Sequence, residues 1–279
     1  MRIWKLHALG NNFVFVLHVD GVDYSSLALA LCRRDISVGA DGLLTIDLSV
    51  SPPMVRMWNP DGTPDFCGNG LCCAALLIRH ISGSDARVLG TPRAFVPVML
   101  KEARAHSAHV TLRTPTPDFE PQTLPLELAH GLRVQRGWEI RADDRTFNVV
   151  SANNGTLHTV IFVDELPTDA VFNCYSRLIE THPLFPDRTN VLWCKIVASG
   201  VRIRIWERGV GETLSCGTGA AAAVAICSHV GYDLPNTVEV AMPGGAAYVS
   251  VAYDGVDLTT LATLVFEGDL ISQPAVCSG

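Results

Sequence analysis

The chain contains the stretch Trp58-Asn-Pro-Asp-Gly-Thr-Pro-Asp-Phe-Cys-Gly-Asn-Gly70. A second stretch of the same design, Trp206-Glu-Arg-Gly-Val-Gly-Glu-Thr-Leu-Ser-Cys-Gly-Thr-Gly219, has its cysteine 149 residues further on. In each copy a glycine stands five residues before the cysteine, an apolar run follows, and a histidine lies thirteen residues beyond (His80, His229). This internal repeat predicts two matching half-sites that face each other, which suits a reaction with mirror-related start and end states.

The apolar runs after the two motifs predict helices over Leu71–Ile81 and Ala220–Val230. Gly83 and Gly231 follow them, and glycine is the residue that best adopts the left-handed conformation of a helix C-terminus. Both helices are apolar nearly all round, so each is expected to be enclosed by the sheet of its own domain. A third, amphipathic helix is predicted around Ser25–Arg34.

Strands are predicted where apolar and polar residues alternate, as in Val201–Trp206, and also at Val160–Val163 and Tyr248–Val251. Residues 114–125 carry four prolines, which exclude a helix or a central strand. We therefore expect an α+β fold of two similar domains, 1–117 and 118–279, each a β-sheet around a central buried helix. The last 15 residues or so are expected to return to the first domain.

Composition is that of a compact enzyme. The 279 residues are 48% hydrophobic, with a net charge of −7 and no basic cluster longer than Arg33-Arg34. Mean hydropathy is +0.25. This charge pattern argues against nucleic acid or an anionic membrane as a partner. The N-terminus lacks the apolar core of a signal peptide, and apolar stretches fall far short of the ~20 residues of a membrane span, so a cytoplasmic location is expected.

The nine cysteines are expected to be mostly free thiols, because no Cys-x-x-Cys or zinc-site spacing occurs. No metal site is expected. Free cysteine often behaves as a small buried hydrophobic residue. Six of the nine lie in apolar stretches and are interpreted as core residues: Cys32, Cys72, Cys73, Cys174, Cys194 and Cys227.

The cysteines of the two motifs, Cys67 and Cys216, stand directly before the predicted helices. The first N–H groups of a helix lack intrahelical partners and carry about half a positive charge, so two such N-termini make a cradle for a carboxylate. The same field favours thiolate, lowering the cysteine pKa from about 8.5. One thiolate would remove an α-proton while the opposing thiol delivers a proton to the other face. This chemistry needs no pyridoxal phosphate or other cofactor.

Several motifs together resemble the diaminopimelate epimerase family, whose members are cofactor-independent and use two cysteine bases. The resemblance covers nearly the whole chain. It rests on the two cysteine motifs, with Asn59-Pro-Asp-Gly before Cys67, and on the stretches Lys5-Leu-His-Ala-Leu-Gly-Asn-Asn-Phe13, Val38-Gly-Ala-Asp-Gly-Leu-Leu44, His182-Pro-Leu-Phe-Pro-Asp-Arg-Thr-Asn-Val191 and Met242-Pro-Gly-Gly245.

The resemblance implies an amino-acid epimerase or racemase, a small amino-acid substrate and a homodimer. It makes Cys67 and Cys216 the catalytic bases, with His158 and Glu207 beside them. The substrate carboxylate would be bound by Gly68, Asn69, Gly217 and Thr218, and the far end of the substrate by Asn11, Asn59, Thr156, Asn190 and Arg208.

Departures from the family pattern concern the substrate more than the chemistry. Thr156 stands where the family has an asparagine that contacts the distal group, and a hydroxyl lacks the donors of an amide. Cys72 replaces an arginine, and Asn12 an aspartate. Such changes in a polar pocket alter specificity strongly. The substrate is therefore diaminopimelate, as in lysine biosynthesis, or another amino acid such as the O-ureidoserine of antibiotic biosynthesis or histidine.

Two other classes stay open from the residues alone. One is an isomerase that shifts a proton on a non-amino carboxylic acid, using the same fold without a site for an α-ammonium group. The other is a non-catalytic ligand-binding or thiol-redox protein in which Cys67 and Cys216 form a switch. Reversible inactivation by oxidant and loss of activity on removing either thiol would support the two-base interpretation.

Overall fold

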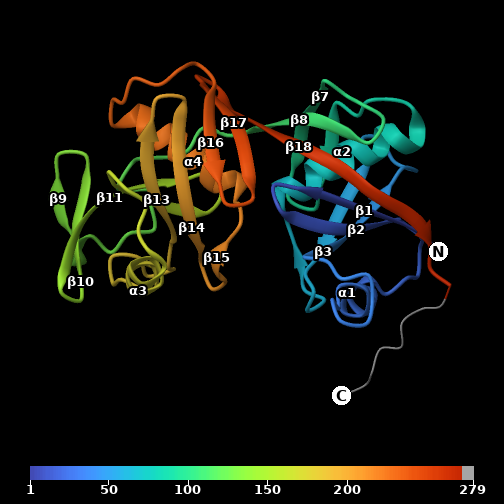
Figure 1. Cartoon of the computed structure of the whole chain (residues 1–279), viewed down its shortest axis with the longest axis horizontal. Coiled ribbons are helices and arrows are strands. Elements are labelled where there is room, and N and C mark those ends of the chain that lie inside the picture. The colour runs from blue at the N-terminus through green and yellow to red at the C-terminus, as the bar shows by residue number, and fades with distance from the viewer. Residues whose placement is uncertain (272–279) are drawn as a thin grey trace. The chain divides into compact units, whose positions relative to one another are not determined.

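The computed structural model describes residues 1–271 (Figure 1). Two compact units divide the chain: unit 1 comprises residues 1–113 and the segment from Thr259 onward, and unit 2 comprises residues 114–258. The first division lies just before the predicted boundary at residue 117. The return to unit 1 begins earlier than the last 15 or so residues that were predicted. Residues 272–279 of that tail, with Cys277, lie outside the described residues.

Unit 1 is a ring of strands. Each strand pairs with the next in the order β1, β2, β3, β4, β6, β7, β8 and β18, and β18 pairs back with β1. The two parallel pairs, β2–β3 and β4–β6, are joined by helices α1 and α2. The bounds are β1 Arg2–Ala8, β2 Asn11–Leu17, α1 Tyr24–Leu31, β3 Gly42–Asp47, β4 Met54–Trp58, β5 Pro64–Asp65, α2 Gly68–Ser82, β6 Val88–Gly90, β7 Phe95–Lys101, β8 Ser107–Thr114 and β18 Gly255–Asp269.

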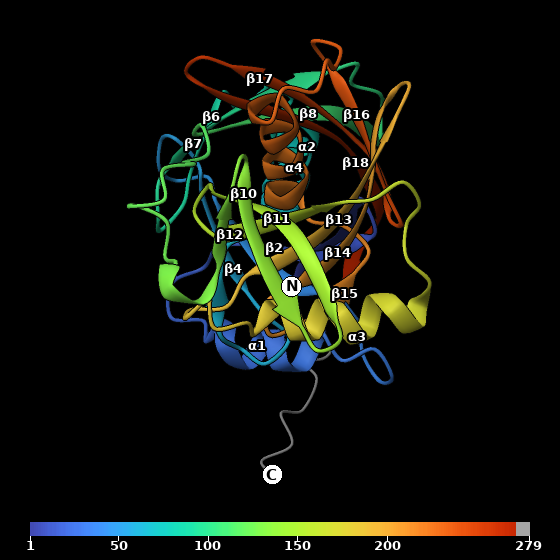
Figure 2. The same cartoon turned by 90° about the vertical axis from the view of Figure 1, so that its left-hand side faces the viewer.

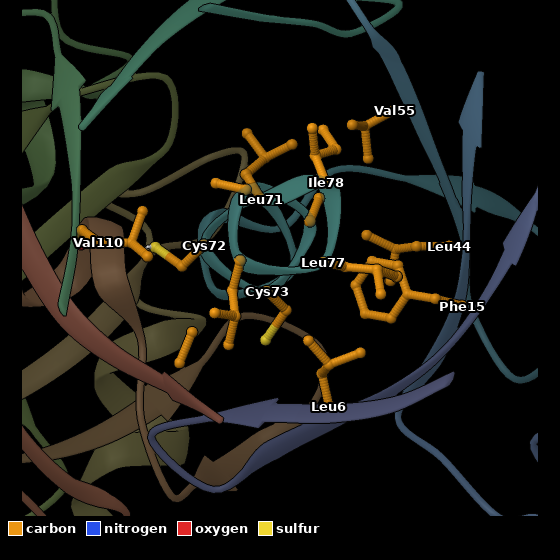
Figure 3. Packing of buried hydrophobic residues seen from close by; sticks show 14 of the residues in the cluster. Leu6, Phe15, Leu44, Val55, Leu71, Cys72, Cys73, Leu77, Ile78 and Val110 are labelled. Atoms are coloured by element: carbon orange, nitrogen blue, oxygen red, sulfur yellow. Dashed lines mark hydrogen bonds between the residues drawn. The ribbon is translucent and has the colours of Figure 1, made fainter. Parts of the chain in front are cut away.

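Helix α2 fills the inside of this ring. Its residues from Leu71 to Ile78 are buried among apolar side chains of the surrounding strands, including Leu6, Phe15 and Val110 (Figure 3). A Cβ atom at Gly70 would lie only 2.9 Å from the Leu44 side chain, so a glycine here lets the helix approach the sheet closely. Burying this apolar surface is the main force that holds the helix, and the Cys67 that precedes it, in place.

Unit 2 repeats the same order of elements. The succession β12, α3, β13, β14, β15, α4, β16, β17 follows β2, α1, β3, β4, β5, α2, β6, β7, with parallel pairs again at β12–β13 and β14–β16. The bounds are η1 Leu128–His130, β9 Leu132–Val134, β10 Gly137–Ala142, β11 Arg145–Asn153, β12 Leu157–Phe162, α3 Asp169–Glu180, β13 Asn190–Val197, β14 Gly200–Glu207, β15 Gly211–Thr213, α4 Gly217–His229, β16 Val238–Met242 and β17 Gly245–Ala252.

Helix α4 is the counterpart of α2, and Figure 2 shows it among the strands of its unit. It contacts β11 to β14, β16 and β17, and its residues from Ala220 to Cys227 are all buried. Helix α3 packs on the other face of the sheet, where Phe172 and Ile179 lie in a cluster with Trp193. Each unit thus has an enclosed helix preceded by a cysteine and an outer helix that covers the sheet.

The predicted α+β class with two similar units is confirmed, with three corrections. Both enclosed helices start earlier than predicted, at Gly68 and Gly217, because glycine is tolerated in a first turn whose N–H groups have no intrahelical partners. Helix α3 was not predicted. Cys174, interpreted as a core residue, is exposed because it lies on the outer side of this amphipathic helix. Among residues 1–271, no helix is long and apolar enough to cross a membrane.

Candidate active site

Cys67 is the N-cap residue of α2, with extended backbone angles φ −142° and ψ 122°. Gly68 is the first helical residue, and the N–H groups of this first turn point toward the space beyond the cysteine. The Cys67 side chain is half-buried and lines a cavity of about 240 Å³. The cavity walls are mostly apolar, with Met57, Phe66 and Leu71 among them. A thiol here sits between the helix dipole and a largely apolar space.

Two asparagines support the start of α2. The amide nitrogen of Asn69 donates to Oδ1 of Asn11, at the beginning of β2, over 2.7 Å. Asn69 is only 2% exposed, so this bond ties the first helical turn to the strand. The structure thus brings together two residues that the sequence placed in separate groups, one for the carboxylate and one for the distal end.

Asn59 begins the turn that leads to Cys67. Its backbone N–H donates to the Thr63 carbonyl, and its side-chain amide donates to the Thr63 hydroxyl and to Asp65, each over 3.2 Å. Asp65 lies 3.6 Å from a guanidinium nitrogen of Arg93, which covers the Phe66 ring at 5.6 Å. Asp65 and Arg93 both line the cavity of Cys67. Sequence reasoning singled out neither: Asp65 lies within the first cysteine motif but was given no role, and Arg93 lies outside the motif.

Cys216 is the N-cap of α4, with φ −142° and ψ 113°, nearly the angles of Cys67. Its sulfur accepts a hydrogen bond from the backbone N–H of Gly219 at 3.4 Å and lies 3.4 Å from the Thr218 hydroxyl. Gly217 starts the helix. Negative charge on this sulfur is stabilised by the N–H group and by the helix dipole. Cys216, Gly217 and Thr218 therefore form one arrangement at the start of α4.

The loop before β12 lies against the same helical turn. The Asn154 amide nitrogen donates to the Thr218 carbonyl over 2.8 Å, while its Oδ1 atom is buried without a partner among the described residues. Gly155 has φ +106°, a conformation that favours glycine. Asn154 was not predicted as a site residue; its position directly before the Gly155-Thr156 departure was the available signal.

His158 is fully buried in β12. Burial and, secondarily, the positive charge of Arg208 lower the pKa of this imidazole to about 3. The ring is therefore neutral at physiological pH. Its Nε2 atom is 3.0 Å from the Thr156 hydroxyl. In a neutral ring one nitrogen carries a hydrogen and donates a hydrogen bond, the other accepts one, and the ring bears no positive charge.

Asn190 lies opposite His158 across the parallel β12–β13 pair. Its Oδ1 accepts from the backbone N–H of Arg208 over 2.9 Å, and its Nδ2 donates to the Leu157 carbonyl at 3.2 Å and to Thr156 Oγ1 at 3.4 Å. The exposed Arg208 side chain donates to the Asp187 carbonyl. The amide of Asn190 thus connects the backbone of Arg208 with Thr156 and Leu157.

Glu207 and Arg208 lie at the β14–β15 turn, which α3 holds in place. Glu180 accepts from the Gly209 backbone N–H over 2.8 Å and from the Trp206 indole over 2.6 Å. Glu207 itself accepts from the Thr213 hydroxyl over 2.6 Å. Glu180 is a positioning residue that the sequence analysis missed. The apolar spacing of α3, with Phe172, Tyr175 and Ile179 buried, was the signal for the helix that carries it.

The predicted residues thus fall into two groups. Unit 1 contains Asn11, Asn59, Cys67, Gly68 and Asn69, and unit 2 contains Thr156, His158, Asn190, Glu207, Arg208, Cys216, Gly217 and Thr218. In the part of the chain that the structure describes, no three His, Cys, Asp or Glu side chains are grouped so that they could hold a metal ion. Each group centres on a cysteine at a helix N-terminus, an arrangement suited to an anion and to proton transfer at sulfur.

Several solved structures have this two-unit fold. A Bacillus anthracis phenazine biosynthesis protein of the PhzF family covers 98% of this chain and 99% of its own, with a TM-score of 0.64 and 16% identity. A probable proline racemase from Agrobacterium radiobacter K84 covers 98% and 93%, with a TM-score of 0.61 and 14% identity. At these identities the likeness shows the fold.

Sequence relatives define the family. The family model for diaminopimelate epimerase matches residues 150–263. A diaminopimelate epimerase from Desulforudis audaxviator is 34% identical over 279 residues, covering 96% of this chain and 98% of its own length. Another from Halothermothrix orenii is 31% identical over 282 residues, covering 96% and 97%. The chain belongs to the diaminopimelate epimerase family, and the protein is an isomerase of the amino-acid epimerase or racemase type.

Proposed function

We propose that the protein inverts the configuration at the α-carbon of an amino acid by a two-base mechanism with Cys67 and Cys216. The main support is that both residues are N-caps with matching backbone angles at the starts of two enclosed helices, each in one copy of a repeated unit. A reaction that interconverts mirror-related centres needs two chemically matched groups, one for each face of the carbon.

In one direction, one cysteine thiolate removes the α-proton and becomes a thiol. The electron pair left at the α-carbon is delocalised into the adjacent carboxylate. The thiol of the other cysteine then gives its proton to the opposite face and becomes a thiolate. In the reverse direction the two roles exchange. N–H groups in the first turns of α2 and α4 stabilise negative charge on the carboxylate, because they have no intrahelical partners.

His158 and Glu207 are assigned to the surroundings of the reacting groups, and Arg208 and Asn59 to the distal end of the substrate. The exposed guanidinium of Arg208 is suited to a distal carboxylate or carbonyl oxygen. The proposed substrate is diaminopimelate, the compound in the names of the relatives, or another amino acid with a polar distal group, such as O-ureidoserine.

Proton exchange measured by NMR in heavy water, with a reductant and no added cofactor, tests the proposal. The panel is LL-diaminopimelate, O-ureido-L-serine, L-histidine and simple L-amino acids. The expected result is loss of the α-proton signal of one compound together with formation of its stereoisomer, detected by chiral chromatography. Exchange that survives in a Cys67→Ala, Cys216→Ala double variant would contradict the two-cysteine mechanism. Lack of exchange on the whole panel would contradict the proposed substrates.

A further inference from the structure

Four residues of unit 2 form a continuous chain of hydrogen bonds that ends at a buried imidazole. We call the chain of Arg208, Asn190, Thr156 and His158 the relay. The backbone N–H of Arg208 donates to Asn190 Oδ1 over 2.9 Å, and Asn190 Nδ2 donates to Thr156 Oγ1 over 3.4 Å. The Thr156 hydroxyl is 3.0 Å from His158 Nε2. All four residues were singled out for substrate or catalysis, yet here they are bonded to one another.

The chemistry of the donors gives this chain a direction. A backbone N–H can only donate, so Oδ1 of Asn190 is the acceptor and the orientation of its amide is fixed. The amide nitrogen must then donate to Thr156 Oγ1. Within residues 1–271 the other partner of that hydroxyl is His158 Nε2, so its hydrogen has one acceptor to bond. The pairing is complete when Thr156 donates and Nε2 accepts.

We propose that Thr156 is a positioning residue that holds His158 as the neutral tautomer with its proton on Nδ1. The opposite tautomer would leave the Thr156 hydroxyl hydrogen without an acceptor inside the described part of the protein. It would also leave the buried Nδ1 lone pair unpaired, so the opposite tautomer has two unpaired groups there and the proposed tautomer has one, the Nδ1–H. The Nδ1 atom is itself buried and has no hydrogen-bond partner among residues 1–271. The relay thus leaves one N–H of His158 available for an acceptor that the protein does not supply.

The position of the ring tells where such an acceptor would lie. Across β12–β13, His158 pairs with Asn190 and Val160 pairs with Leu192, so these side chains share one face of the sheet. The Leu192 side chain is 3.2 Å from the position of a Cβ atom on Gly219, in the first turn of α4. His158 therefore lies on the face that packs against the helix that follows Cys216.

This assignment gives His158 a defined chemical role, which rests on the proposed function. With a proton on Nδ1 and the other nitrogen occupied by Thr156, the ring acts as a hydrogen-bond donor toward a thiolate or a substrate carboxylate. It does not act as a base. The tautomer itself follows from the hydrogen bonds alone and does not depend on the reaction.

A second consequence concerns the substrate. The Thr156 hydroxyl and the Asn190 amide are both used within the relay, so neither is a ready donor for the distal group of a substrate. Recognition of that group then falls to other residues, Arg208 foremost, whose guanidinium is exposed. The relay therefore favours a distal group that accepts hydrogen bonds, such as a carboxylate or a ureido carbonyl, over one recognised as an ammonium.

The tautomer is measured directly by a long-range ¹H–¹⁵N spectrum of protein with ¹⁵N-labelled histidine, at pH 7, with His158 assigned through its backbone. We expect Nδ1 to show the chemical shift of a protonated nitrogen and Nε2 that of an unprotonated one. Thr156→Ser, which retains the hydroxyl, should keep this pattern, and Thr156→Val should shift the population toward Nε2–H. Thr181→Val is the matched control, because that exposed hydroxyl donates to the Arg177 carbonyl of α3 and takes no part in the relay.

A wild-type spectrum with Nε2 protonated would overturn the proposal, as would identical spectra for the wild type and Thr156→Val. If Thr156→Val does not fold, the wild type and Thr156→Ser still decide the tautomer. In turnover, Thr156→Val should lower kcat about tenfold or more, with Thr156→Ser restoring most of it. Absence of turnover on every substrate would count against the proposed function and leave the spectrum as an independent result.

Discussion

The two cysteines begin their helices with nearly the same backbone angles, but the side chains around them differ in kind. In unit 1 the first residue pair of the parallel strands β2 and β3 is Phe13 and Gly42. In unit 2 the equivalent pair of β12 and β13 is His158 and Asn190. Phe13 belongs to the apolar cluster around α2, whereas His158 ends a polar relay on the face toward α4. The duplicated frame places two thiols alike, and local substitutions make their surroundings chemically unequal.

The outer helices show the same contrast. Trp58, opposite Leu43, packs its ring on Tyr24 of α1 at 5.1 Å between centroids. Trp206, opposite Val191, donates its indole N–H to Glu180 of α3. In unit 2 that carboxylate also holds the turn of Arg208 through Gly209. One tryptophan position thus serves packing in unit 1, and in unit 2 it joins packing to the placement of a site residue.

Removing each thiol separately is expected to have the largest effect on activity. It tests whether the two cysteines have equivalent roles. Cys67→Ala and Cys216→Ala should each reduce racemisation in both directions by about 10³-fold or more, because a proton donor or acceptor is lost from one face. Each variant should still exchange the α-proton of only one stereoisomer, and the two variants should prefer opposite ones. Single-turnover exchange in heavy water, measured with each enantiomer, checks this. Loss of exchange with the same stereoisomer in both variants would contradict the assignment to opposite faces.

Acid sensitivity should distinguish the two units through His158. Its pKa is about 3 in the folded protein, below the 6.5 of an unperturbed histidine, so the unfolded chain binds more protons between these values. The stabilisation is therefore complete above about pH 6.5 and is lost as the pH falls toward 3. Between pH 7.5 and 5 the loss should be about 2 kcal/mol.

Urea denaturation at both pH values measures this loss. His158→Phe, which introduces the unit 1 residue, should abolish most of the pH dependence. A smaller dependence of the same sign remains from His182, whose pKa burial also lowers. The prediction is wrong if the free energy of unfolding falls equally between pH 7.5 and 5 in the wild type and in His158→Phe.

The buried cysteines next to the motif test whether the catalytic role belongs to Cys67 and not to its neighbours in α2. Cys72 and Cys73 are fully buried, and burial raises the pKa of the Cys72 thiol to about 12. Replacing either with alanine should lower the free energy of unfolding by on the order of 1–2 kcal/mol while turnover is retained. Thermal unfolding and kcat measured on the same samples check this. A Cys72→Ala variant that folds normally but does not turn over would show that the site is misplaced.

How far the sequence predicts this molecule depends on the range of the interactions. The two enclosed helices and the N-cap cysteines follow from local patterns, and the Cys216 group is a single run of residues. Asn154, Glu180 and Arg93 were missed because each reaches its partner through the fold. Glu180 accepts a hydrogen bond from Gly209 although it lies on a separate helix, and Arg93 covers the Phe66 ring from the β6–β7 loop. The repeat itself implied α3, since α1 occupies the equivalent place in unit 1.

The smallest expected effect comes from restoring an amide at the departure from the family pattern. In Thr156→Asn, the new carbonyl oxygen can accept from Asn190 and one N–H can donate to His158 Nε2, so the relay is preserved. The second N–H remains for a substrate. We therefore expect the ratio of kcat/KM for diaminopimelate to that for the preferred amino acid to rise several-fold, since one added hydrogen bond contributes about 0.5–1.5 kcal/mol. Competition between the two substrates in one tube measures this ratio directly. Thr156→Gln, whose amide is displaced by one methylene, is the matched control. An equal rise of this ratio in both variants would show that the position of the amide at residue 156 does not determine substrate specificity.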